Sequence, residues 1–148
     1  PAILRIQSML AKTSNNRLKV IYKQFDSLIK SLTYEAWPIV IQHGDFAPWN
    51  VFYDEAEGLI AIDWEKGRID GFPYFDLVHF ISQTAALTLK WTPTRCASFI
   101  SNSITLNREQ CAAIAVLGLI ESYFSLEESL SEHHWILDWK LDCMEVFL

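Results

Sequence analysis

An unusual set of side chains lies between two apolar runs of this sequence, in the stretch HGDFAPWN at residues 43–50. The stretch combines His43, Asp45 and Asn50. A carboxylate can orient a hydroxyl group and accept its proton, and an amide oxygen can help to hold a metal ion. Each residue alone has a commoner structural explanation, because Asp, Asn and Pro form turns by bonding to nearby backbone. Turn chemistry explains the combination poorly, so the stretch is a candidate site.

The apolar runs on either side predict a strand followed by a β-hairpin. Residues 39–41 follow Pro38 and are typical of a short buried strand that leads into the stretch. Residues 51–53 and 59–62 are two further apolar runs, and the acidic residues and Gly58 between them indicate a hairpin turn. The candidate site therefore lies where the chain enters the hairpin.

One register of this hairpin brings Asn50 and Asp63 together. If Asp54 opposes Leu59, Asn50 lies opposite Asp63. Directly opposed residues are about 5 Å apart with their side chains on the same face. Such an amide oxygen and carboxylate would suit Mg²⁺, which prefers hard oxygen ligands. A bulge at Gly58, or a loop one residue shorter or longer, would remove this pairing.

The other polar residues of the stretch have expected roles in the same site. Asp45 lies on the loop before the hairpin, where it can reach a substrate hydroxyl. His43 directly follows the predicted strand and is better placed to brace the loop than to react. Gly44 permits the sharp turn that exposes Asp45.

Helical patterns account for most of the remaining chain. Residues 17–32 carry an apolar stripe at steps of three and four, with Asn15 or Asn16 as the cap. The polar segment after Asp63 contains Gly67, Gly71 and Pro73 and is expected to be a loop. Further helical patterns cover residues 75–90, 94–104, 108–128 and 133–147.

Two of these helices have start signals. Thr94, or the Thr-Pro-Thr segment around Pro93, can begin the second, and Asn107 three residues before Gln110 resembles a capping box for the third. No internal repeat or linker interrupts the pattern. We expect one mostly helical α+β domain over residues 1–148.

Composition narrows the class of partner. With 51% apolar and 20% charged residues, the chain is typical of a folded globular protein. Its net charge of −6 disfavours a non-specific nucleic-acid binder and is compatible with cationic or neutral small-molecule substrates. No uninterrupted apolar run reaches the roughly 18 residues of a membrane span. The partners expected are small molecules, with no nucleic acid and no membrane.

The cysteines indicate a reducing compartment. The chain has three, with no C-x-x-C motif, which argues against a disulfide framework and a structural zinc site. We therefore expect a cytoplasmic protein. Cys111 and Cys143 lie among apolar residues of predicted helices and are expected in the core.

Three motifs together resemble a known family. The spacing H-x-D-x-x-x-x-N of His43, Asp45 and Asn50 is that of the catalytic loop of protein-kinase-like enzymes. The segment HGDFAPWNVF resembles the catalytic loop of the aminoglycoside phosphotransferase and choline kinase family. The second signature of that family is Ile-Asp-Trp or Ile-Asp-Phe at the end of the next strand, and Ile62-Asp63-Trp64 matches it. The family's G-x-P-x-x-D-L run is matched by Gly71, Pro73, Asp76 and Leu77. The resemblance spans residues 39–80.

The resemblance implies a fold and a reaction. The fold is the C-terminal lobe of a protein-kinase-like enzyme, with a small hairpin carrying the catalytic loop. The reaction is Mg²⁺-dependent transfer of the γ-phosphoryl group of ATP to a small-molecule hydroxyl. Asp45 would be the catalytic base, and Asn50 and Asp63 would hold Mg²⁺ against the nucleotide phosphates. His43 and Asp76 would support the loop, although Asp76 can equally be a helix N-terminal acid that interacts with the helix dipole.

The resemblance does not extend to the N-terminal lobe. The five glycines form no G-x-G motif, and no Val-Ala-x-Lys strand precedes the catalytic loop. The nucleotide-binding N-terminal lobe is therefore expected to be missing from this chain, and the isolated chain is expected to be inactive. The alternative is a non-catalytic C-lobe fragment or pseudo-enzyme that serves as a binding or interaction module.

Several other residues have competing interpretations. Core packing is expected for Trp49 and Trp64, with stacking on a substrate as the alternative. Glu65 and Asp70 are expected to be solvated acids, with contact to a cationic substrate as the alternative. His133 and His134 would point about 100° apart on a helix and are not expected to share a metal ion.

The C-terminal third has two further clusters. Aromatic and aliphatic residues at helical spacing predict core or a docking face; they are Trp135, Ile136, Leu137, Trp139, Leu141 and Phe147. Acidic residues predict a solvated helix end, with a minor alternative in binding a cationic substrate; they are Glu127, Glu128 and Glu132.

Overall fold

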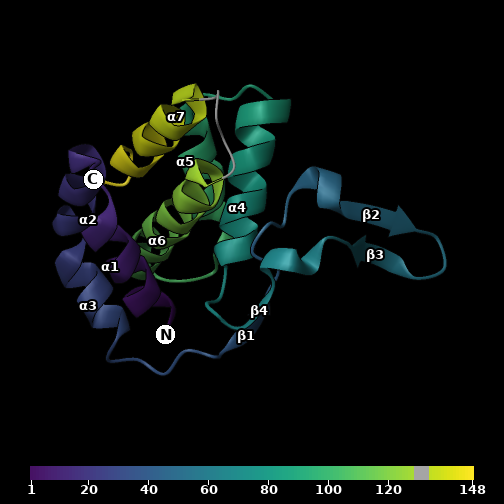
Figure 1. Cartoon of the computed structure of the whole chain (residues 1–148), viewed down its shortest axis with the longest axis horizontal. Coiled ribbons are helices and arrows are strands. Elements are labelled where there is room, and N and C mark those ends of the chain that lie inside the picture. The colour runs from purple at the N-terminus through teal and green to yellow at the C-terminus, as the bar shows by residue number, and fades with distance from the viewer. Residues whose placement is uncertain (129–133) are drawn as a thin grey trace.

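The computed structural model describes residues 1–128 and 134–148 and shows a helical body from which a β-hairpin projects (Figure 1). The helices are α1 (Ala2–Lys12), α2 (Asn16–Gln24), α3 (Asp26–Leu32), α4 (Phe75–Gln83), α5 (Pro93–Ser103), α6 (Arg108–Glu127) and α7 (His134–Glu145). The strands are β1 (Val40–Gln42), β2 (Val51–Asp54), β3 (Gly58–Ala61) and β4 (Arg68–Gly71). Short turns of helix are η1 (Pro48–Asn50), η2 (Trp64–Lys66) and the π-helical η3 (Thr84–Thr88). The prediction of a mostly helical α+β chain is confirmed.

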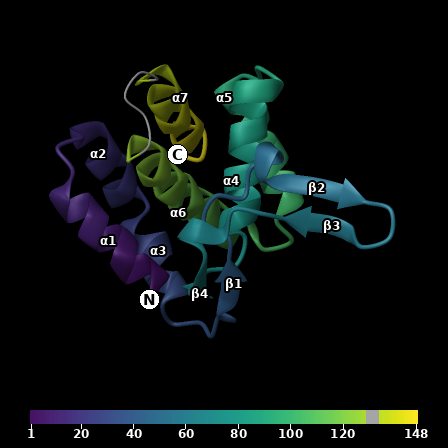
Figure 2. The same ribbon diagram turned by 45° about the vertical axis from the view of Figure 1, so that its right-hand side comes forward.

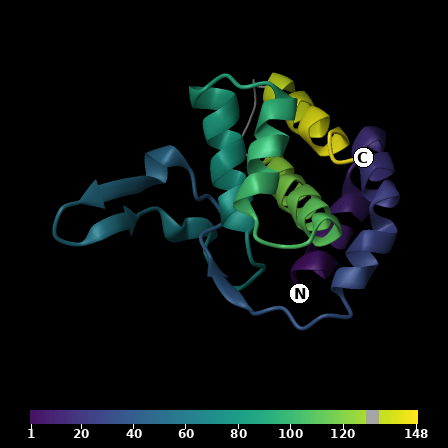
Figure 3. The ribbon, with the colours of Figure 1, turned by 180° about the vertical axis from the view of Figure 1, so that it is seen from behind.

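Helix α6 is the centre of the body. It lies between α1–α3 on one side and α4 on the other, as the turned view and the view from behind both show (Figures 2 and 3). Every residue of its middle part, from Ala113 to Ile120, is buried. For this reason α6 has apolar residues on all sides instead of the single apolar stripe of a surface helix. Buried apolar residues of α1, α2 and α3 pack around it, and Cys111 and Cys143 join the same core as predicted.

The predicted caps begin the helices that the sequence assigns to them. Asn15 accepts a hydrogen bond from Leu18 N–H and begins α2. Thr92, the first Thr of the Thr-Pro-Thr segment, begins α5, so Thr94 is not the cap. Asn107 accepts from Gln110 N–H at 2.9 Å and begins α6. The capping box does not close, because the Gln110 amide donates to the carboxylate of Glu35.

The single helix predicted over residues 17–32 is wrong in one respect. The chain breaks at Phe25, which has φ −93° and ψ 1° and separates α2 from α3. The break turns the second helix so that Phe25 and Ile29 are both buried against the core. Periodicity misses such a break, because the apolar stripe continues at the same spacing on both sides of it.

The loop predicted after Asp63 is also wrong over part of its length. Residues 68–71 form β4, which pairs antiparallel with β1. Glu121 of α6 ties this strand pair to the helical body, because its carboxylate accepts a hydrogen bond from Gln42 of β1 at 2.8 Å. The same carboxylate accepts from Arg5 of α1 at 2.9 Å. The start of the candidate catalytic loop is thus held on both sides, by β4 and by α6.

The β2–β3 hairpin is confirmed, but its predicted register is wrong. Asp54 opposes Gly58 rather than Leu59, which leaves three residues at the tip. The Asp54 carboxylate accepts the N–H groups of Ala56 and Glu57 and stabilises this tighter turn. The pairing of all residues along the two strands is shifted by one position as a result. Asn50 therefore lies opposite Ile62, whose N–H donates to the Asn50 carbonyl at 3.0 Å.

Candidate active site

The loop between β1 and η1 makes a turn that depends on Gly44. Its φ is +80°, a left-handed conformation that glycine adopts without steric cost. A Cβ atom at this position would also collide with the backbone carbonyl oxygen of Lys66. The backbone of the loop therefore packs directly on η2, and this contact fixes where the next residue, Asp45, begins.

Gly44→Ala is expected to destabilise the chain more than Gly58→Ala. Both residues have positive φ, +80° and +81°, so both variants carry the cost of about 1–2 kcal/mol for a left-handed non-glycine residue. A Cβ at Gly58 meets nothing within 4 Å, so only Gly44→Ala adds a collision. Urea unfolding of the two variants measures the difference, and equal losses in free energy of unfolding would contradict the packing described for Gly44.

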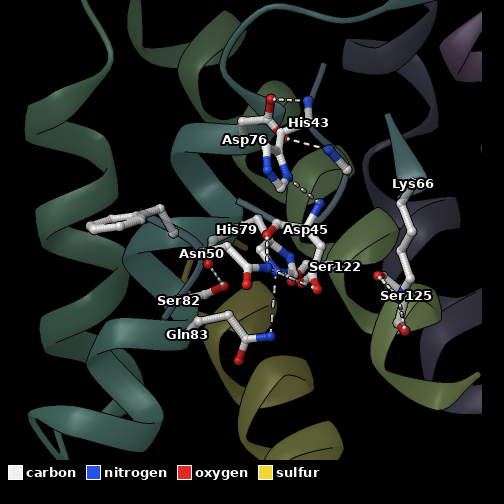
Figure 4. A network of polar contacts seen from close by, with 12 residues as sticks. His43, Asp45, Asn50, Lys66, Asp76, His79, Ser82, Gln83, Ser122 and Ser125 are labelled. Carbon is white, nitrogen blue, oxygen red and sulfur yellow. Dashed lines mark hydrogen bonds and ion pairs between the residues drawn. The ribbon is translucent and has the colours of Figure 1, made fainter. Parts of the chain in front are cut away.

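Asp76 holds the loop by its backbone. Its carboxylate accepts the N–H of His43 at 2.6 Å and the N–H of Gly44 at 3.0 Å (Figure 4). Asp76 lies in the first turn of α4, where the helix dipole also favours a negative charge. Asp76 can therefore both support the loop and interact with the helix dipole. Any acid in the first turn of a helix can do the second, whereas the hydrogen bonds to the loop are specific to this site.

His43 links the loop to the end of the hairpin. It is 1% exposed, and its Nε2 lies 2.7 Å from the carbonyl oxygen of Ile62. A carbonyl oxygen only accepts, so Nε2 must carry the proton, and Nδ1 is left to accept the Asp45 N–H at 3.3 Å. Trp64 packs on the imidazole, with ring centroids 4.5 Å apart. Both ring nitrogens are used in bracing contacts.

Asp45 presents an ionised, partly exposed carboxylate. Its side chain is 27% exposed, and His79 Nε2 lies 3.2 Å from Oδ1. This hydrogen bond is the main reason that the pKa of Asp45 lies below its ordinary value, against the opposing effect of burial. The charge of Lys66 lowers the pKa further. The carboxylate is therefore unprotonated at neutral pH and can accept a proton.

Asn50 is buried beside Asp45 and keeps one oxygen available. Its amide nitrogen donates to the Asp45 carbonyl at 3.0 Å and lies 3.4 Å from Asp45 Oδ2. The amide is thereby oriented with its donor toward Asp45, and within residues 1–128 and 134–148 its oxygen has no hydrogen-bond partner.

The predicted pairing of Asn50 with Asp63 across the hairpin is wrong, because Asn50 lies opposite Ile62. Asp63 follows at the end of β3 with φ 62°, a left-handed conformation that rotates its side chain out of the strand's alternation. Its carboxylate is exposed and has no hydrogen bond among the described residues. The hairpin register therefore does not place Asn50 and Asp63 directly opposite each other, and any common metal ligation rests on the unbonded oxygens of the two residues.

Some expectations for neighbouring residues are wrong. Trp49 and Trp64 are both 49% exposed, so neither is a core residue. Trp64 packs against His43 because the 3-10 turn η2 folds it back over the loop. Glu65 is exposed as expected, and Asp70 is exposed but lies 3.7 Å from Arg5.

The C-terminal predictions have mixed outcomes. Glu127 and Glu128 are exposed at the end of α6, whereas Glu132 and His133 lie outside the described residues, as does the side chain of His134. Ile136 and Leu141 are in the core, and Trp135 is 47% exposed. In the described part of the chain, no group of three or more His, Cys, Asp or Glu residues could hold a metal ion. None of the described helices is long and apolar enough to cross a membrane.

Sequence reasoning missed a buried polar group behind Asp45. It consists of His79, Ser82 and Gln83 of α4, Ser122 of α6 and Lys140 of α7, and each is at most 5% exposed. A signal existed for two of them. His79 lies one helical turn after Asp76, and Lys140 lies on the face of its helix that carries Ile136 and Cys143.

Comparison with known proteins gives one match. No curated protein and no solved structure matches the chain significantly. The family model described as "Phosphotransferase enzyme family" matches residues 5–108, which include His43, Asp45, Asn50, Asp63 and Asp76. The matched segment runs from α1 to the first residue of α6, so it contains the whole candidate site apart from Ser122 and Lys140. The chain belongs to the phosphotransferase enzyme family.

Proposed function

We propose that this chain is the C-terminal lobe of a protein-kinase-like small-molecule kinase, which transfers the γ-phosphoryl group of ATP to an acceptor hydroxyl. The observation that carries the proposal is the state of Asp45. Its carboxylate is ionised, bonded by His79 and partly exposed, on a loop held by Asp76. A fixed carboxylate of this kind is what a phosphotransferase needs beside the attacking hydroxyl.

Asp45 would act on the acceptor. Its Oδ2, which accepts one long hydrogen bond from Asn50, would accept a second from the acceptor hydroxyl and orient the hydroxyl oxygen toward the γ-phosphorus. As the new O–P bond forms and the bond from phosphorus to the β,γ-bridging oxygen breaks, the hydroxyl proton passes to Asp45 and ADP leaves. His43 and Asp76 hold the loop backbone while this happens and take no part in the proton transfer.

Asn50 and Asp63 would hold Mg²⁺. Their oxygens are the hard ligands that this ion prefers, and the Asn50 donor is already used on Asp45, which leaves the amide oxygen for a cation. Mg²⁺ commonly binds through one or two protein side chains together with phosphate oxygens and water, so two residues are sufficient. When bound, the ion would neutralise charge on the ATP phosphates.

The lobe that covers ATP would come from outside these residues. The sequence has no G-x-G motif and no strand lysine ahead of the catalytic loop, which are the parts that cover and pair the phosphates in protein-kinase-like enzymes. We therefore propose that the 148 residues supply the acceptor-side half of the active site only.

This division of the site predicts low activity for the isolated chain. The 148 residues and the full-length product of the gene are compared by ADP release with Mg²⁺-ATP and a panel of acceptors: an aminoglycoside, choline, an amino alcohol and a sugar. We expect Mg²⁺-dependent turnover by the full-length product with at least one acceptor class, and little or none by the isolated chain.

Two results would count against the proposal in different ways. Robust turnover by the isolated chain would contradict the missing-lobe proposal, while its loss in Asp45→Asn would still support the site. Binding of an acceptor with no turnover in either protein would favour a non-catalytic binding module.

A further inference from the structure

A line of buried polar groups runs from Asp45 to the ammonium group of Lys140. His79 Nε2 lies 3.2 Å from Asp45 Oδ1, and His79 Nδ1 lies 2.7 Å from Ser122 Oγ. Lys140 Nζ lies 2.8 Å from the same Ser122 oxygen. The close view shows His79 and Ser122 meeting directly behind Asp45 (Figure 4). Three residues, one each from α4, α6 and α7, thus connect the partly exposed carboxylate of Asp45 with the interior.

Lys140 is a costly residue to bury. Its side chain is 0% exposed, and it contacts the hydroxyl groups of Ser82 and Ser122 at 2.8 Å each. Among the described residues no carboxylate forms an ion pair with it, and the titratable groups that interact with it are His79, Cys96 and Cys143. Burial lowers its pKa to about 8, so it is still mostly protonated at neutral pH. An apolar side chain would fill this place without the desolvation cost, which indicates that the charge has a use.

The chemistry of Lys140 sets the direction of each hydrogen bond. An ammonium group has donors only, so Ser122 Oγ must accept from Lys140. The one hydroxyl hydrogen of Ser122 is then free to donate, and His79 Nδ1 is the acceptor it reaches. Nδ1 is therefore the unprotonated nitrogen, and the proton of a neutral His79 resides on Nε2. That Nε2–H donates to Asp45 Oδ1.

The surroundings keep His79 neutral. Its pKa lies below the ordinary value, first because the ring is buried and further because of the charge of Lys140, while Asp45 opposes the shift. A second proton, on Nδ1, would also take from the Ser122 hydroxyl hydrogen the acceptor that it reaches on the ring. The Gln83 amide nitrogen lies 3.5 Å from Nε2, where two donors would face each other, and among the described residues the Gln83 amide oxygen has no hydrogen-bond partner. Rotation of this amide would give the Nε2–H a second acceptor.

We propose that Lys140, acting through Ser122, fixes His79 as the Nε2–H tautomer, and that this relay positions the Asp45 carboxylate. Oδ1 is then bonded to His79, and Oδ2, which accepts one long hydrogen bond from the Asn50 amide at 3.4 Å, can accept a second from the acceptor hydroxyl. The inference rests on the proposed function of Asp45. His79, Ser122 and Lys140 are positioning residues, since they act on the acceptor only through Asp45. Ser122 and Lys140 lie beyond the segment that the family model matches, residues 5–108.

Ser82 provides a matched control for Ser122. Both are buried serines that accept from Lys140 Nζ at 2.8 Å, and only Ser122 bonds to the His79 ring. Ser122→Ala and Ser82→Ala therefore each remove one hydroxyl acceptor from Lys140, but only Ser122→Ala also removes the hydrogen bond to the His79 ring. Lys140→Met removes the charge with a side chain of similar length.

The tautomer is measured directly by ¹⁵N NMR of the histidine-labelled chain, with His79 assigned through His79→Gln. We expect an unprotonated Nδ1 and a protonated Nε2 in the wild-type chain and in Ser82→Ala. Ser122→Ala and Lys140→Met should give a mixture of tautomers, because Nδ1 no longer faces an obligatory donor. An unchanged His79 tautomer in both of these variants would overturn the relay, whether or not the protein is active.

Turnover by the full-length product gives a second readout. Ser122→Ala and Lys140→Met are expected to lower kcat about tenfold with little change in KM, the size expected for loss of one orienting hydrogen bond. Ser82→Ala should leave kcat unchanged. If both serine variants lowered kcat equally and neither changed the tautomer, the residues would be structural only. An intact tautomer pattern in a protein without phosphoryl transfer would instead reject the proposed function and not the hydrogen-bond relay.

Discussion

Asp45→Asn is expected to lower kcat for phosphoryl transfer by about 10²- to 10⁴-fold, the usual contribution of a positioned proton acceptor. The amide has nearly the same shape as the carboxylate, and its oxygen can still accept from His79 Nε2–H. The loop should therefore keep its place on Asp76. What is lost is the ability to take up the hydroxyl proton.

This prediction is tested by steady-state kinetics on the full-length gene product, with thermal unfolding measured in parallel. Asp54→Asn is the control, because it makes the same change in an exposed acid at the hairpin tip, away from the site. Its kcat should equal that of the wild type. If Asp45→Asn kept more than about a tenth of wild-type kcat with an unchanged Tm, Asp45 would not be the proton acceptor.

Asp76→Ala is expected to have the largest effect on stability, a loss of about 3 kcal/mol in the free energy of unfolding. The estimate follows from two hydrogen bonds to a charged acceptor, each worth roughly 1.5 kcal/mol or more. Their removal leaves the N–H groups of His43 and Gly44 without partners and frees the loop that carries Asp45. Turnover should fall with stability, because the carboxylate is no longer held in place.

Asp26→Ala separates these bonds from the helix-dipole effect. Asp26 is also an acid in the first turn of a helix, α3, but its ion-pair partner is the exposed Lys30 and it does not contact the loop. Urea unfolding of both variants should give a much smaller loss for Asp26→Ala. Similar losses would mean that Asp76 acts through the helix dipole alone, and that its contacts with the loop contribute little.

The elements with local signals were predictable. The helical pattern of residues 108–128, the caps Asn15 and Asn107 and the two strands of the hairpin all depend on residues within a few positions of each other. The spacing of His43, Asp45 and Asn50 is likewise a local property of one loop. These features were recognised because propensity, capping and turn chemistry act over short distances along the chain.

The wrong predictions have two different causes. The hairpin tip is one residue shorter than predicted because of a local contact, in which the Asp54 side chain accepts the N–H groups of a tighter turn. Distant residues decide the other two outcomes. Strand β4 forms because β1 is available to pair with it, and Trp64 packs on His43 while staying half exposed. No pattern within β4 or η2 specifies these partners.

The amino-acid sequence by itself determined which chemical groups this protein has and which local elements carry them: an acid and an amide on one loop, a second acid after a hairpin, and a helical body. Only the tertiary structure decided how the acid is held. Asp76 reaches the loop backbone from α4, and His79, Ser122 and Lys140 meet behind Asp45 from three helices. In these contacts, residues separated by up to 43 positions come into hydrogen-bond distance only through packing of the core, which sequence spacing does not encode.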